Sequence, residues 1–202
     1  MAVDLLADLY AITNRPDLVD LSKTALWMAT SELHKLDFFK KDIVEQYISV
    51  SDTTSAGTGH PLQLALPINF RRWKYIRPRL IDGSYGQPLV QQEASDIFDV
   101  VDHGRGCTLA TEVYYNAGLN CNIYTAKQVQ GFLLGYYSVP LRITDWYLTD
   151  WLCQQHSETV TEMAAAKLFA IVENEAMAQI HLRFVEPLKR QIIVQETLET
   201  EG

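Results

Sequence analysis

Apolar side chains recur at three- and four-residue spacing near the start of the chain, between residues 15 and 39. Such spacing gives a helix one continuous apolar stripe, with Lys23, Glu32 and Lys35 on the opposite face. Pro16 suits the first turn of a helix, where a missing N–H costs nothing. The pattern predicts a long amphipathic helix over 15–39 that needs a second helix to cover its stripe.

A second helical pattern occupies the last third of the chain. Thr159 and Glu162 have the spacing of a capping box, in which each side chain bonds the other residue's free backbone N–H. Pro187 should end or kink this helix at Glu186, because proline lacks an N–H and clashes with the preceding turn. We therefore expect a helix from about Thr159 to Glu186.

The two long helices should bury their apolar faces against each other. Three consecutive alanines at 164–166 would allow a close approach, and Phe184 would widen the buried face of the second helix. The expected core of this bundle consists of Leu18, Leu21, Ala25, Leu33, Leu36, Ala164, Leu168 and Ile171.

The middle of the chain has β-strand patterns. Residues 112–116 and 120–124 flank Ala-Gly-Leu, which predicts a hairpin whose turn holds Gly118 at a positive φ. Residues 129–137 are apolar on both faces, as a central strand requires. The segments before residue 112 mix short strand patterns with glycine-rich turns.

The last fifteen residues follow Pro187 and have no evident place in the bundle. This tail could form an extended arm that docks on another molecule, because an exposed apolar segment usually marks a partner site. It could also fold back onto its own core. The docking residues of the expected arm are Leu188, Lys189, Arg190, Ile192, Ile193 and Val194.

These patterns predict an α+β protein that is mainly a helical bundle. Residues 1–45 and 145–187 would form the bundle, 46–144 would form a small inserted antiparallel β lobe, and 188–202 would form the extended C-terminal arm. A chain of 202 residues is long enough to bury its own core without disulfides or metals.

Composition narrows the classes of function. A net charge of −8 argues against general affinity for DNA or anionic membranes, although it allows a local basic patch. Three widely spaced cysteines indicate reduced thiols, and the first residues lack the pattern of a signal peptide. No apolar run is long enough for a membrane span. We expect a protein folded in a cytoplasm.

Catalytic and metal-binding patterns do not emerge from the sequence. The five histidines have no zinc-helix spacing, and no phosphate-binding loop or nucleophile elbow occurs. The carboxylates are scattered, so no acid–base pair can be nominated. We expect neither an enzyme nor a cofactor.

One local charge anomaly lies between residues 71 and 79. The basic residues Arg71, Arg72, Lys74, Arg77 and Arg79 alternate there with Trp73 and Tyr75. Basic and aromatic side chains together can bind nucleic acid by phosphate contact and stacking. The alternative, which the net negative charge favours, is a strand with Trp73 and Tyr75 inward and the cations outward against acidic neighbours or a protein partner.

Several short motifs, in their order and spacing, resemble the head–tail connector, or adaptor, proteins of tailed bacteriophages. They cover most of the chain but not residues 80–110. The motifs lie at 14–18, 37–39 with Asp42, 64–67, 70–72, 75–77, 114–115, 117–118, 136–140, Trp151 and 164–169.

The resemblance implies a structural protein of the virion neck, assembled in the host cytoplasm. Such proteins form homo-oligomeric rings, usually dodecamers, between the portal protein and the tail or the next neck ring. Packaged DNA would pass through the channel without sequence-specific contacts, and the tail of this chain would clasp the portal. Two other functions stay open: a tail-proximal stopper or tail-tube ring, and a small nucleic-acid-binding module that uses Arg71–Arg79.

Overall fold

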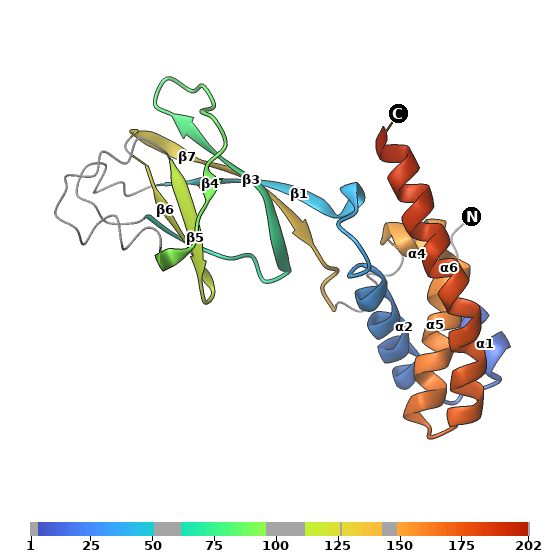
Figure 1. Ribbon diagram of the computed structural model, residues 1–202. Coiled ribbons are helices and arrows are strands. Elements are labelled where there is room, and N and C mark those ends of the chain that lie inside the picture. Colours follow the sequence, from blue (N-terminus) through green and yellow to red (C-terminus); the bar gives the residue numbers. More distant parts are fainter. Residues whose placement is uncertain (1–3, 51–61, 96–111, 126, 143–148, 202) are drawn as a thin grey trace. The chain divides into compact units, whose positions relative to one another are not determined.

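The computed structural model describes residues 4–50, 62–95, 112–125, 127–142 and 149–201. The chain divides into two compact units (Figure 1). One unit consists of Met1–Asp42 together with Val139–Gly202, and its described elements are helical. The other unit is Ile43–Ser138 and contains the described strands.

The helical unit is built around one central helix. The helix α5 packs against α1, α2, α4 and α6, so its buried surface extends almost around it. This explains the three alanines at its centre, since small side chains let neighbouring helices approach. The elements of the unit are α1 (Leu5–Thr13), α2 (Val19–Leu33), the 3-10 turn η1 (Lys40–Asp42), α4 (Trp151–Gln155), α5 (Ser157–Ile171) and α6 (Glu175–Glu201).

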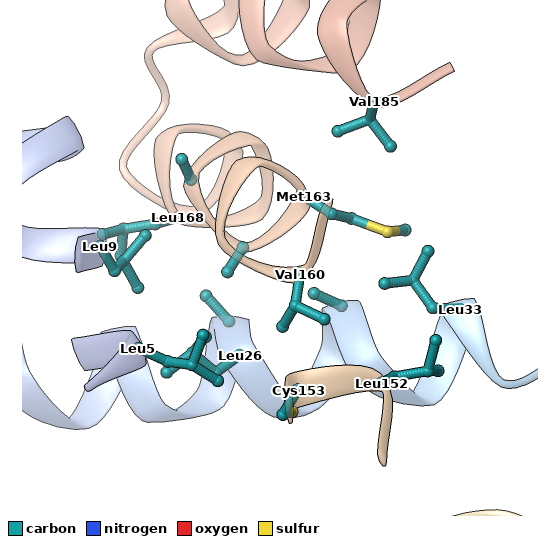
Figure 2. Close-up of a cluster of buried hydrophobic side chains, with 14 of the residues drawn as sticks. Leu5, Leu9, Leu26, Leu33, Leu152, Cys153, Val160, Met163, Leu168 and Val185 are labelled. Atoms are coloured by element: carbon teal, nitrogen blue, oxygen red, sulfur yellow. The ribbon is translucent and has the colours of Figure 1, made fainter. Parts of the chain in front are cut away.

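Side chains from five of these helices form the core of the unit. Figure 2 shows Val160 and Met163 of α5 between Leu26 and Leu33 of α2 on one side and Val185 of α6 on the other. Leu5 and Leu9 of the short helix α1 are completely buried in the same cluster, which explains how so short a helix is stable.

Two of the residues predicted to lie in the core are not buried there. Ala25, Leu33, Ala164 and Leu168 are buried, and Leu18 and Leu36 pack partly against them. Leu21 and Ile171, however, are each more than a third exposed. The buried stripe of α2 includes Ser22, so its neighbour Leu21 points about 100° away. Ile171 is the last residue of α5, where the chain leaves the core.

Both predicted helix starts are also wrong. The helix α2 begins at Val19 instead of Pro16, after a turn in which Arg15 pairs with Asp17. The helix α5 begins at Ser157, two residues before Thr159, so no capping box forms there. The expected single helix from about Thr159 to Glu186 is also wrong, because the chain turns after Ile171 and starts a separate helix, α6, at Glu175.

Pro187 does not end the last helix. α6 runs from Glu175 to Glu201 with Pro187 inside it. The proline removes one backbone hydrogen bond, but Val185 before it and Ile192 after it are buried in the same core. Tertiary packing on both sides of Pro187 therefore keeps the helix continuous, and residues 188–201 are helical instead of extended.

The second unit contains two sheets packed on a common core. The three-stranded sheet has the order β1-β7-β3 and the four-stranded sheet the order β2-β6-β5-β4. Trp73, Phe132 and Leu134 of the first sheet meet Tyr114 and Ile123 of the second. The strands are β1 (Ile43–Ser49), β2 (Leu62–Ala65), β3 (Phe70–Leu80), β4 (Val90–Gln91), β5 (Val113–Ala117), β6 (Asn120–Tyr124) and β7 (Val129–Ser138).

Two predictions for this unit are confirmed. The strands β5 and β6 form the expected antiparallel hairpin, and Gly118 in its turn has a φ of 59°. The strand β7 is central, with β1 and β3 on its two sides. Both follow from local signals: a glycine between alternating segments, and a run that is apolar on both faces.

The protein is α+β, but the expected architecture within that class is wrong. The strands are not a small lobe inserted in a helical bundle, because Ile43–Ser138 forms a compact unit of its own with two sheets and nearly half of the chain. One strand pair, β4 with β5, is parallel instead of antiparallel. The expected extended arm is the second half of α6.

Candidate functional site

The helix α6 has two opposite apolar faces. On the inner face, Ala178, Val185 and Ile192 are spaced by seven residues and are buried. On the outer face, Ile180, Phe184 and Val194 are 45%, 59% and 57% exposed. Offsets of four and fourteen residues from Ile180 return to within about 40° of the same direction, so these three side chains share one stripe with Pro187. We call Ile180, Phe184, Pro187 and Val194 the outer stripe.

Polar contacts fix the inner side of α6 along its length. Near its start, His181 Nδ1 lies 2.7 Å from Glu162 Oε2, and the His181 ring stacks on Phe169. Near its end, Lys41 Nζ donates to Glu196 Oε1 at 2.8 Å. Since α6 is held at both ends, the outer stripe is presented on a rigid support.

The residues of the predicted arm fall on different sides of this helix. Ile192 belongs to the core, and Leu188 and Ile193 are half-buried. Lys189 interacts with Glu32 and Glu186. Only Arg190 and Val194 of the predicted set are exposed among the described side chains.

One residue of the outer stripe, Phe184, is assigned to the wrong face by the sequence pattern. The sequence pattern predicts that Phe184 widens the core face, yet its side chain is 59% exposed. The available signal was the broad apolar distribution around this helix, more than one packed face requires. Because the partner helices could not be placed from the sequence, the buried side could not be distinguished from the exposed one.

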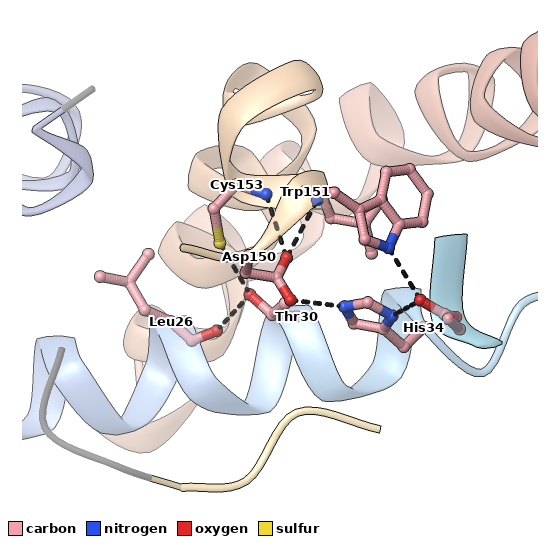
Figure 3. A network of polar contacts seen from close by, with 8 residues as sticks. Leu26, Thr30, His34, Asp150, Trp151 and Cys153 are labelled. Atoms are coloured by element: carbon pink, nitrogen blue, oxygen red, sulfur yellow. Dashed lines mark hydrogen bonds and ion pairs between the residues drawn. The ribbon is translucent and has the colours of Figure 1, made fainter. Parts of the chain in front are cut away.

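A buried polar cluster joins three segments of the helical unit (Figure 3). His34, just after α2, lies 2.7 Å through Nδ1 from Asp42 Oδ1 and 2.8 Å through Nε2 from Asp150 Oδ2. Trp151 Nε1 also donates to Asp42 Oδ1 at 2.7 Å, while Asp150 caps α4 by accepting from the N–H groups of Leu152 and Cys153.

The two aspartates determine the charge of His34. Burial of the ring lowers its pKa, but the hydrogen bonds to Asp150 and Asp42 and their charges outweigh burial and raise the pKa to about 9. The imidazole is therefore protonated at neutral pH, with both nitrogens donating. A ring held in this way has no free lone pair for base catalysis. The cluster fastens η1 and α4 to α2.

The described residues give no other assembled chemistry. A shallow depression of about 320 Å³ lies between α1 and α5 and is lined by Asp8, Ile12, Glu158 and Glu162 among others. Within the described ranges, no three His, Cys, Asp or Glu side chains are placed to hold a metal ion. Burial raises the pKa of Cys121 to about 12 and that of Cys153 still further, so neither thiol is a nucleophile at neutral pH.

The basic stretch lies on β3, but not as expected. Trp73 is buried in the core, whereas Tyr75 points to the opposite face and bonds Glu45. The cause is a β-bulge between Trp73 and Tyr75, which inserts Lys74 and reverses the alternation of side chains. The expectation that both aromatic residues point inward is therefore wrong.

The fold and these surfaces define a two-unit α+β protein with an exposed apolar helix face. The sequence matches no protein-family profile and no curated protein. None of the helices in the described part of the chain combines the length and apolar character needed to cross a membrane.

Proposed function

We propose that this chain is a structural subunit of the head–tail connector of a tailed phage. Copies of the chain form a closed ring, with a dodecamer as the expected state, between the portal and the tail. The order and spacing of the connector-like motifs suggest this class of protein, and the outer stripe of α6 is the observation that carries the proposal.

The outer stripe needs a partner for a physical reason. Burying a side chain such as Phe184 or Ile180 stabilises a protein by roughly 1.5 to 3 kcal/mol. An isolated subunit lacks this stabilisation. A ring subunit uses two different surfaces to contact its two neighbours. In the proposed ring, the outer stripe packs on a different surface of the next copy.

The sheet unit also exposes apolar side chains. Ile68, after β2, is 90% exposed, and Leu119, in the β5–β6 turn, is 83% exposed. The two loops lie side by side, because the Leu66 N–H donates to the Leu119 carbonyl at 2.8 Å. A pair of apolar loop tips suits contact with the next ring or the tail. In this proposal each unit of the chain has its own contact with other virion proteins.

The second half of α6 is the proposed contact with the portal, as a helix. Of the predicted arm residues, Arg190 is exposed there and lies outside the outer stripe. Many such contacts around a ring give avidity even where each one is weak. The net charge of −8 fits a channel through which DNA slides.

The test is assembly of the purified chain, measured by mass photometry and electron microscopy with and without the portal protein of the same virion. We expect closed rings, alone or on the portal. Replacing Phe184 by Asp should weaken assembly about tenfold or more, because a charge enters an apolar contact. Met28→Asp is the matched control, since Met28 is an exposed apolar residue on a different helix.

Two outcomes would count against this function. A chain that stays monomeric with the portal and with tail proteins is not a connector. Rings that bind tail proteins but not the portal would indicate the alternative function, a tail-proximal stopper. Loss of assembly in Met28→Asp as well as Phe184→Asp would show that the outer stripe is not the specific contact.

A further inference from the structure

The three-stranded sheet has an outer face that the core does not use. Side chains directly opposite in neighbouring strands point to the same face. The core side is known from Ile76, Phe132 and Leu134, which are buried between the sheets. The outer face therefore carries the alternate rungs Ser49–Gly131–Arg79, Tyr47–Leu133–Arg77, Glu45–Gly135–Tyr75 and Ile43–Tyr137–Arg72.

Two tyrosine rings lie across glycines on this face. A Cβ at Gly135 would approach three atoms of the Tyr75 ring within 2.6 to 2.9 Å, so the ring covers that glycine face-on. A Cβ at Gly131 would meet the Ile48 carbonyl oxygen first and would lie 2.5 Å from the Tyr47 hydroxyl. Gly135 leaves room for the Tyr75 ring to lie flat against the sheet, and Gly131 leaves room for the hydroxyl end of the Tyr47 ring. Four residues separate the glycines, which places them roughly 13 Å apart along β7.

Cations from β3 border these rings. The Arg79 guanidinium lies over the Tyr47 ring, 5.4 Å from its centre, and Lys74 Nζ, turned outward by the bulge, lies over the Tyr137 ring, 5.9 Å from its centre. Within the described ranges, no acceptor reaches the buried Nε of Arg77 or Arg79. The acidic residue on these rungs, Glu45, already bonds the Tyr75 hydroxyl.

We propose that this outer face binds single-stranded nucleic acid. Flat aromatic rings on a sheet stack bases, and cations beside them contact the phosphates. The ligand has to supply both planar groups and anionic oxygens in alternation, which a single strand does. An acidic protein surface would satisfy the cations but would leave the partly exposed rings of Tyr47 and Tyr75 without planar partners.

Binding at this face does not require a ring, so it is tested independently of the connector function. Fluorescence anisotropy with a labelled oligothymidylate measures the affinity of the full chain over a series of salt concentrations. Four phosphate contacts, from Arg72, Lys74, Arg77 and Arg79, predict that log K falls with log salt with a slope of about −3.

Paired variants separate charge from stacking. Replacing Arg77 and Arg79 together by Gln should bring the slope toward about −1.4, because two cations, Arg72 and Lys74, remain. The Lys pair at the same positions keeps the charge and should keep the slope. Tyr47→Leu should weaken binding roughly five- to a hundredfold by removing a stacking ring, while Tyr47→Phe should bind normally.

The matched control is Lys23→Gln with Arg183→Gln, which removes two positive charges from the helical unit and should leave binding unchanged. Circular dichroism confirms that each variant is folded. The proposal fails if the folded wild-type chain does not bind the oligonucleotide. It also fails if polyglutamate competes as well as the oligonucleotide does, or if the control variant loses as much affinity as the Arg77 and Arg79 pair.

Discussion

Loss of the proton from His34 should make the helical unit less stable at high pH, and replacing His34 by Gln should remove this dependence. The ring lies between Asp42 and Asp150 at 2.7 and 2.8 Å and is only 3% exposed. No water separates the ring from these carboxylates at such distances, so the interaction is poorly screened. His34 is thus the group whose titration should control stability above neutral pH.

The magnitude follows from the change in pKa. In the folded chain the His34 pKa is raised from 6.5 to about 9. At about 1.4 kcal/mol for each pH unit between the two values, the proton contributes at most roughly 3 kcal/mol to the free energy of unfolding. That is a large part of the 5 to 15 kcal/mol typical of a folded domain.

The sign is fixed by which state binds the proton more tightly. The folded state has the higher pKa, so it keeps the proton after the unfolded state has lost it. The stabilisation is therefore complete below about pH 6.5 and is lost as the pH rises through about 9. Below pH 6.5 both states are protonated, and this histidine contributes no slope.

The assay is urea unfolding followed by circular dichroism at 222 nm, which reports mainly on the helical unit. It is repeated at pH values from 6 to 10. The wild-type chain should lose up to about 3 kcal/mol across this range. Titration of the His34 ring by nuclear magnetic resonance gives the pKa directly and should place it near 9.

Two variants provide the controls. His34→Gln should lose about 3 to 5 kcal/mol at pH 6, because it leaves two buried carboxylates without their cation, and its stability should vary little from pH 6.5 to 9. Asp150→Asn keeps an acceptor for the cap of α4 but removes one carboxylate, so the pH dependence should shrink. A wild-type stability that stays flat over this range, or a His34→Gln variant with an unchanged slope, would refute the reasoning.

Two further predictions concern packing and backbone conformation. Ile192→Ala should lower the free energy of unfolding by about 2 to 5 kcal/mol, because Ile192 is buried in the core. The exposed control, Val194→Ala, should change it by less than about 0.5 kcal/mol. Equal effects of the two variants in urea unfolding would mean that the end of α6 is not packed. Gly118→Val should lower the free energy of unfolding by about 1 to 2 kcal/mol or more, because the φ of 59° at this position is unfavourable for a branched residue. Gly118→Asn should lower it by less. Similar melting temperatures for the two variants would contradict the assigned turn.

The parts of the fold that could be predicted from sequence depend on neighbours in the chain. The β5–β6 hairpin needs only two alternating segments and Gly118 between them. The central position of β7 follows from its two apolar faces. Such signals lie within about ten residues, so no knowledge of the tertiary structure is needed to use them.

The errors arise where distant residues decide the local structure. Pro187 remains helical because the core binds α6 on both sides of it, and no local rule contains that information. The His34 cluster joins residues 116 positions apart in sequence. The bulge at Lys74 is a single extra residue that reverses the alternation of side chains along β3, and the basic stretch by itself does not reveal it.

The surfaces of the two units differ in a way that bears on both proposals. The outer stripe of α6 is apolar and rigidly held, which suits a lasting contact between proteins, because apolar burial is hardly affected by salt. The outer face of the three-stranded sheet combines cations with flat rings, which suits a polyanion, and its contacts weaken as salt rises. Salt therefore distinguishes them: raising it should release nucleic acid from the sheet unit and leave contacts through Phe184 intact.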